Sequence, residues 1–504
     1  MSESSYRTIL SASSIIGGAQ VLNIVFGLIR MKAAAVLLGP AGVGLVGLYI
    51  NLTQTAATVA SLGVPTVGTR QIASANMEGG DLAVGRTRRA LFWGTLVLAL
   101  IGAVLFWLAS DWVARVVLAA PDRAAEIKWL SLGVALIVAT GYQSALLTGM
   151  RRVGDLARIT IGAGLVGTVM GVLALWVWGP AGLLVMVLVA PAVTLILGHF
   201  FVARLGPAKG YAPRLPEMAR EWSGLARLGF AFMLSGIVTL LGQLGARMLV
   251  QRELGPEALG QFQAAWTIGM TYLGFVLTAM GTDYFPRLSA VIKDPVQACR
   301  LVNEQTEVAL LLCAPVLLLM LGGAPWVIRL LYSPEFGPAI DILRWQLLGD
   351  ILKVISWPLG FVILARGAGK TFALTESLAM TTLLAGLWFG LTRIGLTASG
   401  IAFLAMYTVY LPLVWWLGGR TIDFGWSRAV KWQGGTLIAA AVTVNIVGRW
   451  SDLAGGALAL ILALAAGMWA LRRLSEKGAV GGRAGLLAAA LERRIFKYTP
   501  TRRN

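Results

Sequence analysis

Charged residues are scarce in this sequence, and so are the residue types that hold metals or form disulfides. Only 13% of the 504 residues are charged, whereas 57% are hydrophobic. The chain has two cysteines, Cys299 and Cys313, and one histidine, His199. Two thiols and one imidazole are too few for a disulfide framework or a metal cluster. We therefore predict no metal site and no cofactor.

Groupings of catalytic residues are missing as well. The sequence has no histidine cluster, no paired acidic motif and no loop long enough to form a soluble catalytic domain. Acid–base and metal-assisted catalysis need such groups at a defined spacing. We therefore predict that the protein is not an enzyme and has no catalytic residues.

Long apolar runs dominate what is present. Runs of about 18 residues or more recur along the chain, and this length crosses a bilayer as a helix. They do not alternate with period two, as the strands of a membrane barrel would. The sequence therefore predicts an all-α polytopic membrane protein. Its fourteen expected spans are 11–37, 42–70, 90–109, 128–149, 157–178, 183–203, 223–253, 260–282, 302–322, 341–365, 372–392, 399–418, 432–448 and 454–471.

One stretch of the chain occurs twice in similar form. Residues 30–70 and 247–287 each read as an apolar segment ending in arginine, a Leu-Gly-Pro turn and a second apolar segment ending in arginine. The offset is 216 residues at the turns and 217 at Arg30 and Arg247. Weaker echoes continue to Arg151 and Arg366. Self-similarity at a nearly constant offset indicates two similar halves.

Six expected spans in each half make the two halves parallel repeats, related by an axis along the membrane normal, with a cleft between them. Two spans and a tail follow the second half. The predicted domains are an N-terminal lobe, a cytoplasmic linker, a C-terminal lobe, two additional spans and a basic cytoplasmic tail, at residues 1–204, 205–222, 223–420, 421–472 and 473–504.

The net charge of +19 comes from residues that lie mostly on one side of this predicted topology. Basic residues are about three times as numerous on the side of the N-terminus as on the other. Cytoplasmic loops carry such an excess, so we predict that both termini are cytoplasmic and that nucleic acid is not a partner. Leu487, Leu491 and Ile495 predict either a helix on the anionic leaflet or a solvated basic tail.

Polar side chains form stripes on two of the expected spans. Their three- and four-residue spacings place them on one helical face, and each stripe ends at an arginine. One interpretation is a cavity that binds substrate; the other is helix–helix hydrogen bonding with arginines that extend to the surface. The first stripe contains Gln20, Asn23 and Arg30, and the second contains Thr239, Gln243 and Arg247. Lys32 and Arg252 are candidates for an outer shell.

The tenth expected span carries two opposite charges, Asp350 and Lys353, near mid-membrane. Charges are costly there and usually mark a cavity or a pathway. Their spacing of three residues allows them to neutralise each other. They form either an ion pair that stabilises the helix position or a titratable pair that senses substrate.

The chain resembles the oligosaccharide flippases of the O-antigen translocase (Wzx) type, within the superfamily of multidrug, oligosaccharidyl-lipid and polysaccharide exporters. The resemblance covers most of residues 1–420 and rests on three segments: LLGPAGVGLVG, WQLLGDILKV and ILARGAGKTFALTE. The two additional C-terminal spans exceed the twelve usual in these flippases and are similar to the fourteen of the lipid II flippase.

This resemblance implies a substrate, a location and a mechanism. The substrate would be an oligosaccharide on undecaprenyl pyrophosphate, moved from the cytoplasmic to the periplasmic leaflet of the bacterial inner membrane by alternating access. Membrane lipids would be partners, with a glycan polymerase and chain-length proteins as further candidates. Arginine suits a pyrophosphate because it binds in a bidentate manner and stays charged. Arg30, Arg247, Gln20, Asn23, Gln243, Lys353 and Asp350 are therefore the candidate substrate-binding residues.

Two other functions compete. A cation-coupled multidrug extruder would need carboxylates inside the N-terminal lobe, and the interiors of the first six expected spans contain none. A membrane-embedded glycan polymerase or transferase would need the catalytic groupings that the sequence lacks.

Overall fold

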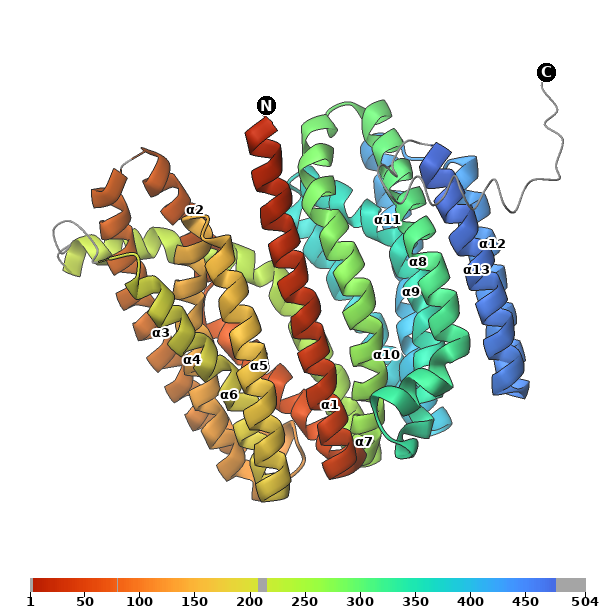
Figure 1. The fold of residues 1–504 in the computed structure, drawn as a ribbon, viewed down its shortest axis with the longest axis horizontal. Helices are drawn as coiled ribbons and strands as arrows, with labels where there is room; N and C mark the ends of the chain where they lie inside the picture. Colours follow the sequence, from red (N-terminus) through yellow and green to blue (C-terminus); the bar gives the residue numbers. More distant parts are fainter. Residues whose placement is uncertain (1–2, 79, 207–214, 477–504) are drawn as a thin grey trace. The chain divides into compact units, whose positions relative to one another are not determined.

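The computed structural model describes residues 3–78, 80–206 and 215–476, and in these residues the chain is helical without a strand (Figure 1). This confirms the predicted all-α fold. The helices are α1 (Glu3–Ala60), α2 (Val64–Glu78), α3 (Gly80–Val116), α4 (Ala124–Gly149), α5 (Val153–Trp178), α6 (Gly182–Ala203), α7 (Leu215–Val291), α8 (Pro295–Leu331), α9 (Gly337–Ala365), α10 (Gly369–Ile394), α11 (Ala398–Ile422), α12 (Arg428–Trp450) and α13 (Asp452–Glu476).

The two longest helices are each divided by a glycine. In α1 the break lies at Gly39 (φ 65°, ψ −166°), and in α7 it lies at Gly255 (φ 87°, ψ −179°). Glycine adopts a positive φ without steric cost, and the proline that follows each glycine lacks the N–H that would continue the hydrogen-bond ladder. The Leu-Gly-Pro turns of the sequence repeat are therefore present as equivalent breaks.

The number of membrane crossings stays a prediction. In the described residues, eight helical stretches are long and apolar enough to cross a bilayer, or nine if one bent pair is counted. Several stretches are longer than one crossing needs. The stretch Val153–Ala203, for example, has 51 residues and contains both α5 and α6. The predicted count of fourteen spans is therefore untested.

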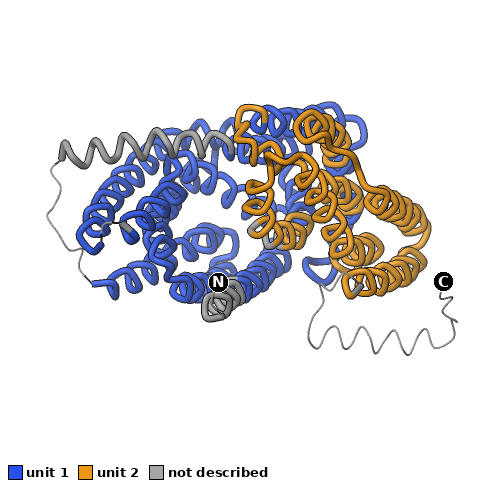
Figure 2. Tube along the Cα trace, turned by 90° about the horizontal axis from the view of Figure 1, so that it is seen from above, with its two compact units in different colours: residues 1–267, 328–342, 372–402 blue, residues 268–327, 343–371, 403–504 orange. Residues whose placement is uncertain are grey.

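The chain divides into two compact units (Figure 2). Unit 1 comprises Met1–Thr267, Ile328–Ile342 and Phe372–Ala402, and unit 2 comprises Ile268–Val327, Leu343–Thr371 and Phe403–Asn504. Unit 1 therefore combines the first half of the repeat with parts of the second. The predicted lobe boundaries remain a prediction.

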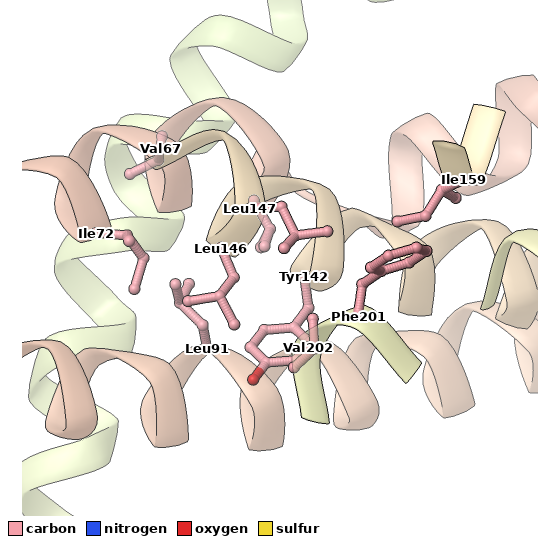
Figure 3. Close-up of a cluster of buried hydrophobic side chains, with 10 residues drawn as sticks. Val67, Ile72, Leu91, Tyr142, Leu146, Leu147, Ile159, Phe201 and Val202 are labelled. Atoms are coloured by element: carbon pink, nitrogen blue, oxygen red, sulfur yellow. The ribbon is translucent and has the colours of Figure 1, made fainter. Parts of the chain in front are cut away.

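A cluster of buried side chains joins α2, α3, α4, α5 and α6 in unit 1 (Figure 3). It includes Ile72, Leu91, Tyr142 and Val202. Beside it, Arg88 donates hydrogen bonds to the Tyr142 hydroxyl and to the backbone oxygens of Val202 and Gly206. A basic side chain satisfies free carbonyls at a helix C-terminus in this way. The end of α6 is thus held against α3 and α4, directly before residues 207–214 of the predicted linker, which lie outside the described residues.

Apolar side chains also cover outward-facing surfaces. On α3, Leu100, Ile101, Val104 and Leu105 are all about half exposed or more. A face of this kind would be unfavourable in water but matches the hydrocarbon of a bilayer. Together with the long apolar helices, it identifies a multi-pass membrane protein.

In unit 2, the two additional helices α12 and α13 lie side by side (Figure 1). A Cβ on Gly455 would lie 2.4 Å from Cα of Gly448, so glycines allow the close approach of the two backbones. Arg344 of α9 is buried and forms an ion pair with Asp452 of α13 at 3.0 Å. This pair connects the additional helices to α9. The tail predicted at 473–504 lies outside the described residues from 477 onward.

Candidate functional site

The helices that follow the two breaks meet at equivalent positions of the repeat. Gly44 and Gly260 are 216 residues apart and in direct contact: a Cβ on Gly44 would lie 2.8 Å from the Gly260 nitrogen. A Cβ on Gly260 would lie 1.8 Å from the Pro40 carbonyl oxygen. The two repeats therefore touch each other at equivalent glycines.

A second pair of equivalent positions is also in contact, but its two residues differ. Gly47 corresponds to Gln263, and a Cβ on Gly47 would lie 2.3 Å from Cδ of Gln263. The missing side chain on one repeat makes room for the amide of the other. Gln263 Oε1 accepts a hydrogen bond from Arg247 Nε at 3.0 Å, and its Nε2 donates to Thr267 at 2.9 Å. The amide of Gln263 thus orients the guanidinium of Arg247.

Arg247 is buried, with 4% of its surface exposed. Besides the bond to Gln263, its Nη1 donates to the Gln243 backbone oxygen at 3.0 Å, and its guanidinium lies 5.7 Å from the centre of the Trp266 ring. Within the described residues, it has no ion pair with a carboxylate. A buried cation held by neutral groups is costly and favours a bound anion.

Arg30, the repeat equivalent of Arg247, has different surroundings. It lines a pocket of about 350 Å³ formed by α1, α4, α5 and α6 in unit 1. No described residue forms a hydrogen bond or ion pair with its guanidinium. The lining residues are Asn23, Arg30, Ile50, Thr53, Gln54, Ile137, Thr140, Thr160, Ala163, Gly164, Met186, Val187, Ala190, Pro191 and Thr194. The pocket therefore combines polar and aliphatic side chains with one positive charge.

Small residues of α5 bring α1 and α6 to this pocket. A Cβ on Gly164 would lie 2.7 Å from the Phe26 ring and 3.1 Å from Oδ1 of Asn23, so the glycine lets α1 approach and positions Asn23. Gly167 does the same for Ala190 of α6, where a Cβ would lie 2.9 Å from the alanine Cβ. Glycines at helix interfaces allow such close packing in membranes.

A second polar cluster lies in unit 2 around Asp350, which is fully buried. Its Oδ2 accepts a hydrogen bond from the Tyr272 hydroxyl at 3.2 Å, while its Oδ1 has no hydrogen-bond partner in the described part of the chain. Lys353 lies 3.5 Å from the Met270 sulfur and 5.9 Å from the centre of the Tyr407 ring, and its charge acts on Asp350. Their functional pairing stays a prediction.

The remaining predicted site residues are dispersed. Gln20 and Arg252 are exposed, and Gln243 meets Arg247 through its backbone oxygen. Lys32 donates to the Arg329 backbone oxygen at 3.3 Å and to that of Tyr332. These bonds connect the first half of the chain to the end of α8. The predicted outer-shell role of Lys32 and Arg252 is untested.

The sequence did not reveal Gln263, Trp266 or the threonines of the pocket as candidates. The repeat offered a signal for Gln263, because it occupies the position of Gly47 at the offset of the turns. For the threonines there was none, since each comes from a different segment and the rotation of the helices decides which cavity a hydroxyl faces.

The comparisons with known proteins point to a single family. Residues 9–291 match the model of the family described as "Polysaccharide biosynthesis protein". The chain belongs to this family. Over 421 residues it is 24% identical to the lipid III flippase of Escherichia coli (strain K12), covering 81% of this chain and 97% of that protein.

Two solved structures have the same fold as this chain. The lipid II flippase MurJ in an inward closed conformation aligns with a TM-score of 0.69 at 11% identity, covering 92% of this chain and 99% of that one. An inward-facing multidrug-resistance MATE family transporter of the MOP superfamily aligns with a TM-score of 0.65 at 15% identity, covering 83% and 99%. The chain therefore has the fold of this superfamily, and the predicted family resemblance is confirmed.

Proposed function

We propose that this protein is a flippase that moves undecaprenyl-pyrophosphate-linked oligosaccharide from the cytoplasmic to the periplasmic leaflet of the bacterial inner membrane. Both termini would be cytoplasmic, and the product would enter surface polysaccharide biosynthesis. The family match and the similarity to a lipid III flippase along most of the chain support this proposal. A glycan polymerase and chain-length proteins are proposed partners.

The proposal rests mainly on the surroundings of Arg247. Its charge is buried and is held by an amide, a backbone oxygen and an aromatic ring. A guanidinium binds phosphate oxygens in a bidentate manner and cannot lose its charge. An anionic pyrophosphate would supply the negative charge that the described surroundings of Arg247 do not.

Arg30 and Arg247 would together contact the pyrophosphate. They occupy equivalent repeat positions, and each ends a polar stripe of its helix. Two guanidiniums repel each other without an anion, and a pyrophosphate between them removes that repulsion. The substrate would then shift the conformational equilibrium by its different contacts in each state, as alternating access requires. Gln20, Asn23 and Gln243 would contact the glycan, Asp350 and Lys353 would respond to its binding, and Lys32 and Arg252 would form an outer shell.

A cation-coupled multidrug extruder would have the same fold, but the charge of the pocket in unit 1 is less favourable for its substrates. The pocket in unit 1 carries a guanidinium and no carboxylate among its lining residues, so it would repel a cationic drug. The likeness to the multidrug transporter shows the fold alone. Transport without a reaction on the glycan is therefore the function that we propose.

The proposal is tested by glycan export in cells that lack the chromosomal copy. Arg30→Ala and Arg247→Ala should each reduce export at least tenfold, and Arg30→Lys and Arg247→Lys should restore little of it because lysine lacks the planar fork. Arg300→Ala is the matched control, since Arg300 is exposed and pairs with Glu304. Normal export by both alanine variants, at wild-type membrane levels, would refute the pyrophosphate contact.

A further inference from the structure

Threonine hydroxyls from four helical segments converge on the pocket of Arg30. Thr53 comes from the second part of α1, Thr140 from α4, Thr160 from α5 and Thr194 from α6. Threonine is common in membrane helices, so a single threonine does not indicate a binding site. Here, however, each wall of one cavity contributes a hydroxyl, and the cavity also contains a guanidinium without a described partner.

All four hydroxyls use their hydrogen inside their own helix. They donate to the backbone oxygens of Tyr49, Ile137, Leu156 and Ala190 at 2.6, 2.8, 2.9 and 2.8 Å, respectively. A hydroxyl has one donor and two acceptor lone pairs. The threonines therefore present only acceptors to the cavity, and a ligand must donate the hydrogen bonds.

The donors of the pocket come from the other polar side chains. Asn23 and Gln54 carry amide N–H groups, and Arg30 carries five N–H donors with a full charge. The rest of the wall is aliphatic, from residues such as Ile50, Ile137 and Val187. A fitting ligand thus has several hydroxyls, apolar C–H faces and a neighbouring anionic group.

This combination excludes other classes of ligand. A free inorganic anion would meet the acceptor oxygens of the threonines on the sides away from Asn23, Arg30 and Gln54. A cationic drug would meet the guanidinium, and an acyl chain would leave the polar groups unsatisfied, which is costly. The volume of about 350 Å³ is at the small end of the range for ligand pockets, so it suits one part of an oligosaccharide.

We propose that this pocket binds the sugar residue attached directly to the diphosphate of the lipid carrier. The sugar hydroxyls donate to the oxygens of Thr140, Thr160 and Thr194, while Arg30 contacts the adjacent phosphate. This inference rests on the proposed flippase function and adds to it a subsite for the first sugar.

The test compares two probes on the purified full-length protein in lipid nanodiscs. One probe is undecaprenyl diphosphate, and the other is the same carrier bearing a single glucose, galactose or N-acetylglucosamine. Wild-type protein should bind at least one glycosylated carrier about tenfold more tightly than the bare carrier. Each hydrogen bond to a hydroxyl contributes about a two- to tenfold change in affinity.

The decisive variant is Thr140→Val/Thr160→Val/Thr194→Val, which removes three acceptors with little change in shape. It should bind bare and glycosylated carrier equally, and its unchanged affinity for the bare carrier serves as the folding control. The matched control is Thr382→Val/Thr408→Val/Thr443→Val, because these threonines form the same bond to their own helix outside the pocket. The control should keep the wild-type preference.

The outcomes separate the two proposals. Wild-type protein that binds none of the four carriers would overturn the flippase function and, with it, the subsite. Wild-type protein that binds all four carriers equally would overturn the subsite alone. A preference that survives in the pocket variant would also overturn it, since the threonine oxygens would then not be the groups that recognise the sugar.

Discussion

The contact between Gly44 and Gly260 predicts that two similar substitutions in α7 have opposite effects. A Cβ on Gly260 would lie 1.8 Å from the oxygen and 2.4 Å from the carbon of the Pro40 carbonyl. These are backbone atoms at a helix start, so no side-chain rotation relieves the clash. A Cβ on Gly274, in the same helix, would meet no atom within 4 Å.

The magnitudes follow from two competing effects. Replacing a glycine in a helix by alanine stabilises the helix by about 0.5–1 kcal/mol. Forcing a methyl group into a closely packed contact costs about 1–3 kcal/mol. Gly274→Ala should therefore stabilise the protein by about 0.5–1 kcal/mol. Gly260→Ala should destabilise it by about 1–2 kcal/mol, since the clash outweighs the gain in helix propensity.

The assay is thermal unfolding of the purified variants in one detergent, followed by tryptophan fluorescence. The midpoint should rise for Gly274→Ala and fall for Gly260→Ala. Gly44→Ala should also lower it, because its Cβ would meet the Gly260 nitrogen at 2.8 Å. Equal stabilisation by all three substitutions would show that the two repeats do not touch at their breaks in the dominant state.

Two further predictions concern charged groups. Lys353→Met should impair export, because it leaves the buried Asp350 carboxyl uncompensated at a cost of about 3–5 kcal/mol. Adding Asp350→Asn should restore part of the export. A double variant that exports less than either single variant would show that the two residues do not act as a pair. Lys32→Met should lower the unfolding midpoint because the backbone oxygens of Arg329 and Tyr332 lose a charged donor, worth about 1 kcal/mol at a helix end. Lys32→Arg should retain most of that stability, and an unchanged midpoint for Lys32→Met would contradict the contact.

Most of the helices and the breaks at Gly39 and Gly255 could be predicted from the sequence because they have local causes, whereas the expected span 42–70 was wrong in its end, since α1 ends at Ala60 and α2 begins at Val64. Apolar runs of sufficient length specify helices, and Gly39 and Gly255 permit the positive φ before a proline that cannot continue the hydrogen-bond ladder. The repeat was visible because both breaks have the same residues at one offset. Local causes did not decide which groups surround Arg30 and Arg247.

The surroundings of the two arginines depend on helix packing, which a single sequence does not encode in readable form. Equivalent spacing from the turns suggested that Arg30 and Arg247 are alike. In the structure, Arg247 is bound to an amide and lies near an indole ring, whereas Arg30 faces a pocket. The difference arises from residues about 15 to 20 positions further along the chain, in the helix after the break.

This asymmetry separates the roles of the two arginines. The positions that hold Arg247 are Gln263 and Trp266, and at the offset of 216 the first repeat has Gly47 and Ile50 there. Glycine offers no acceptor and isoleucine no π face, so Arg30 has no equivalent anchor. In the proposed function, Arg247 would therefore supply a charge in a constant position, whereas Arg30 would use its donors to bind a ligand. Because a constant charge favours binding of any anion, the proposed function places selectivity for a particular anion in the repeat whose arginine is not anchored.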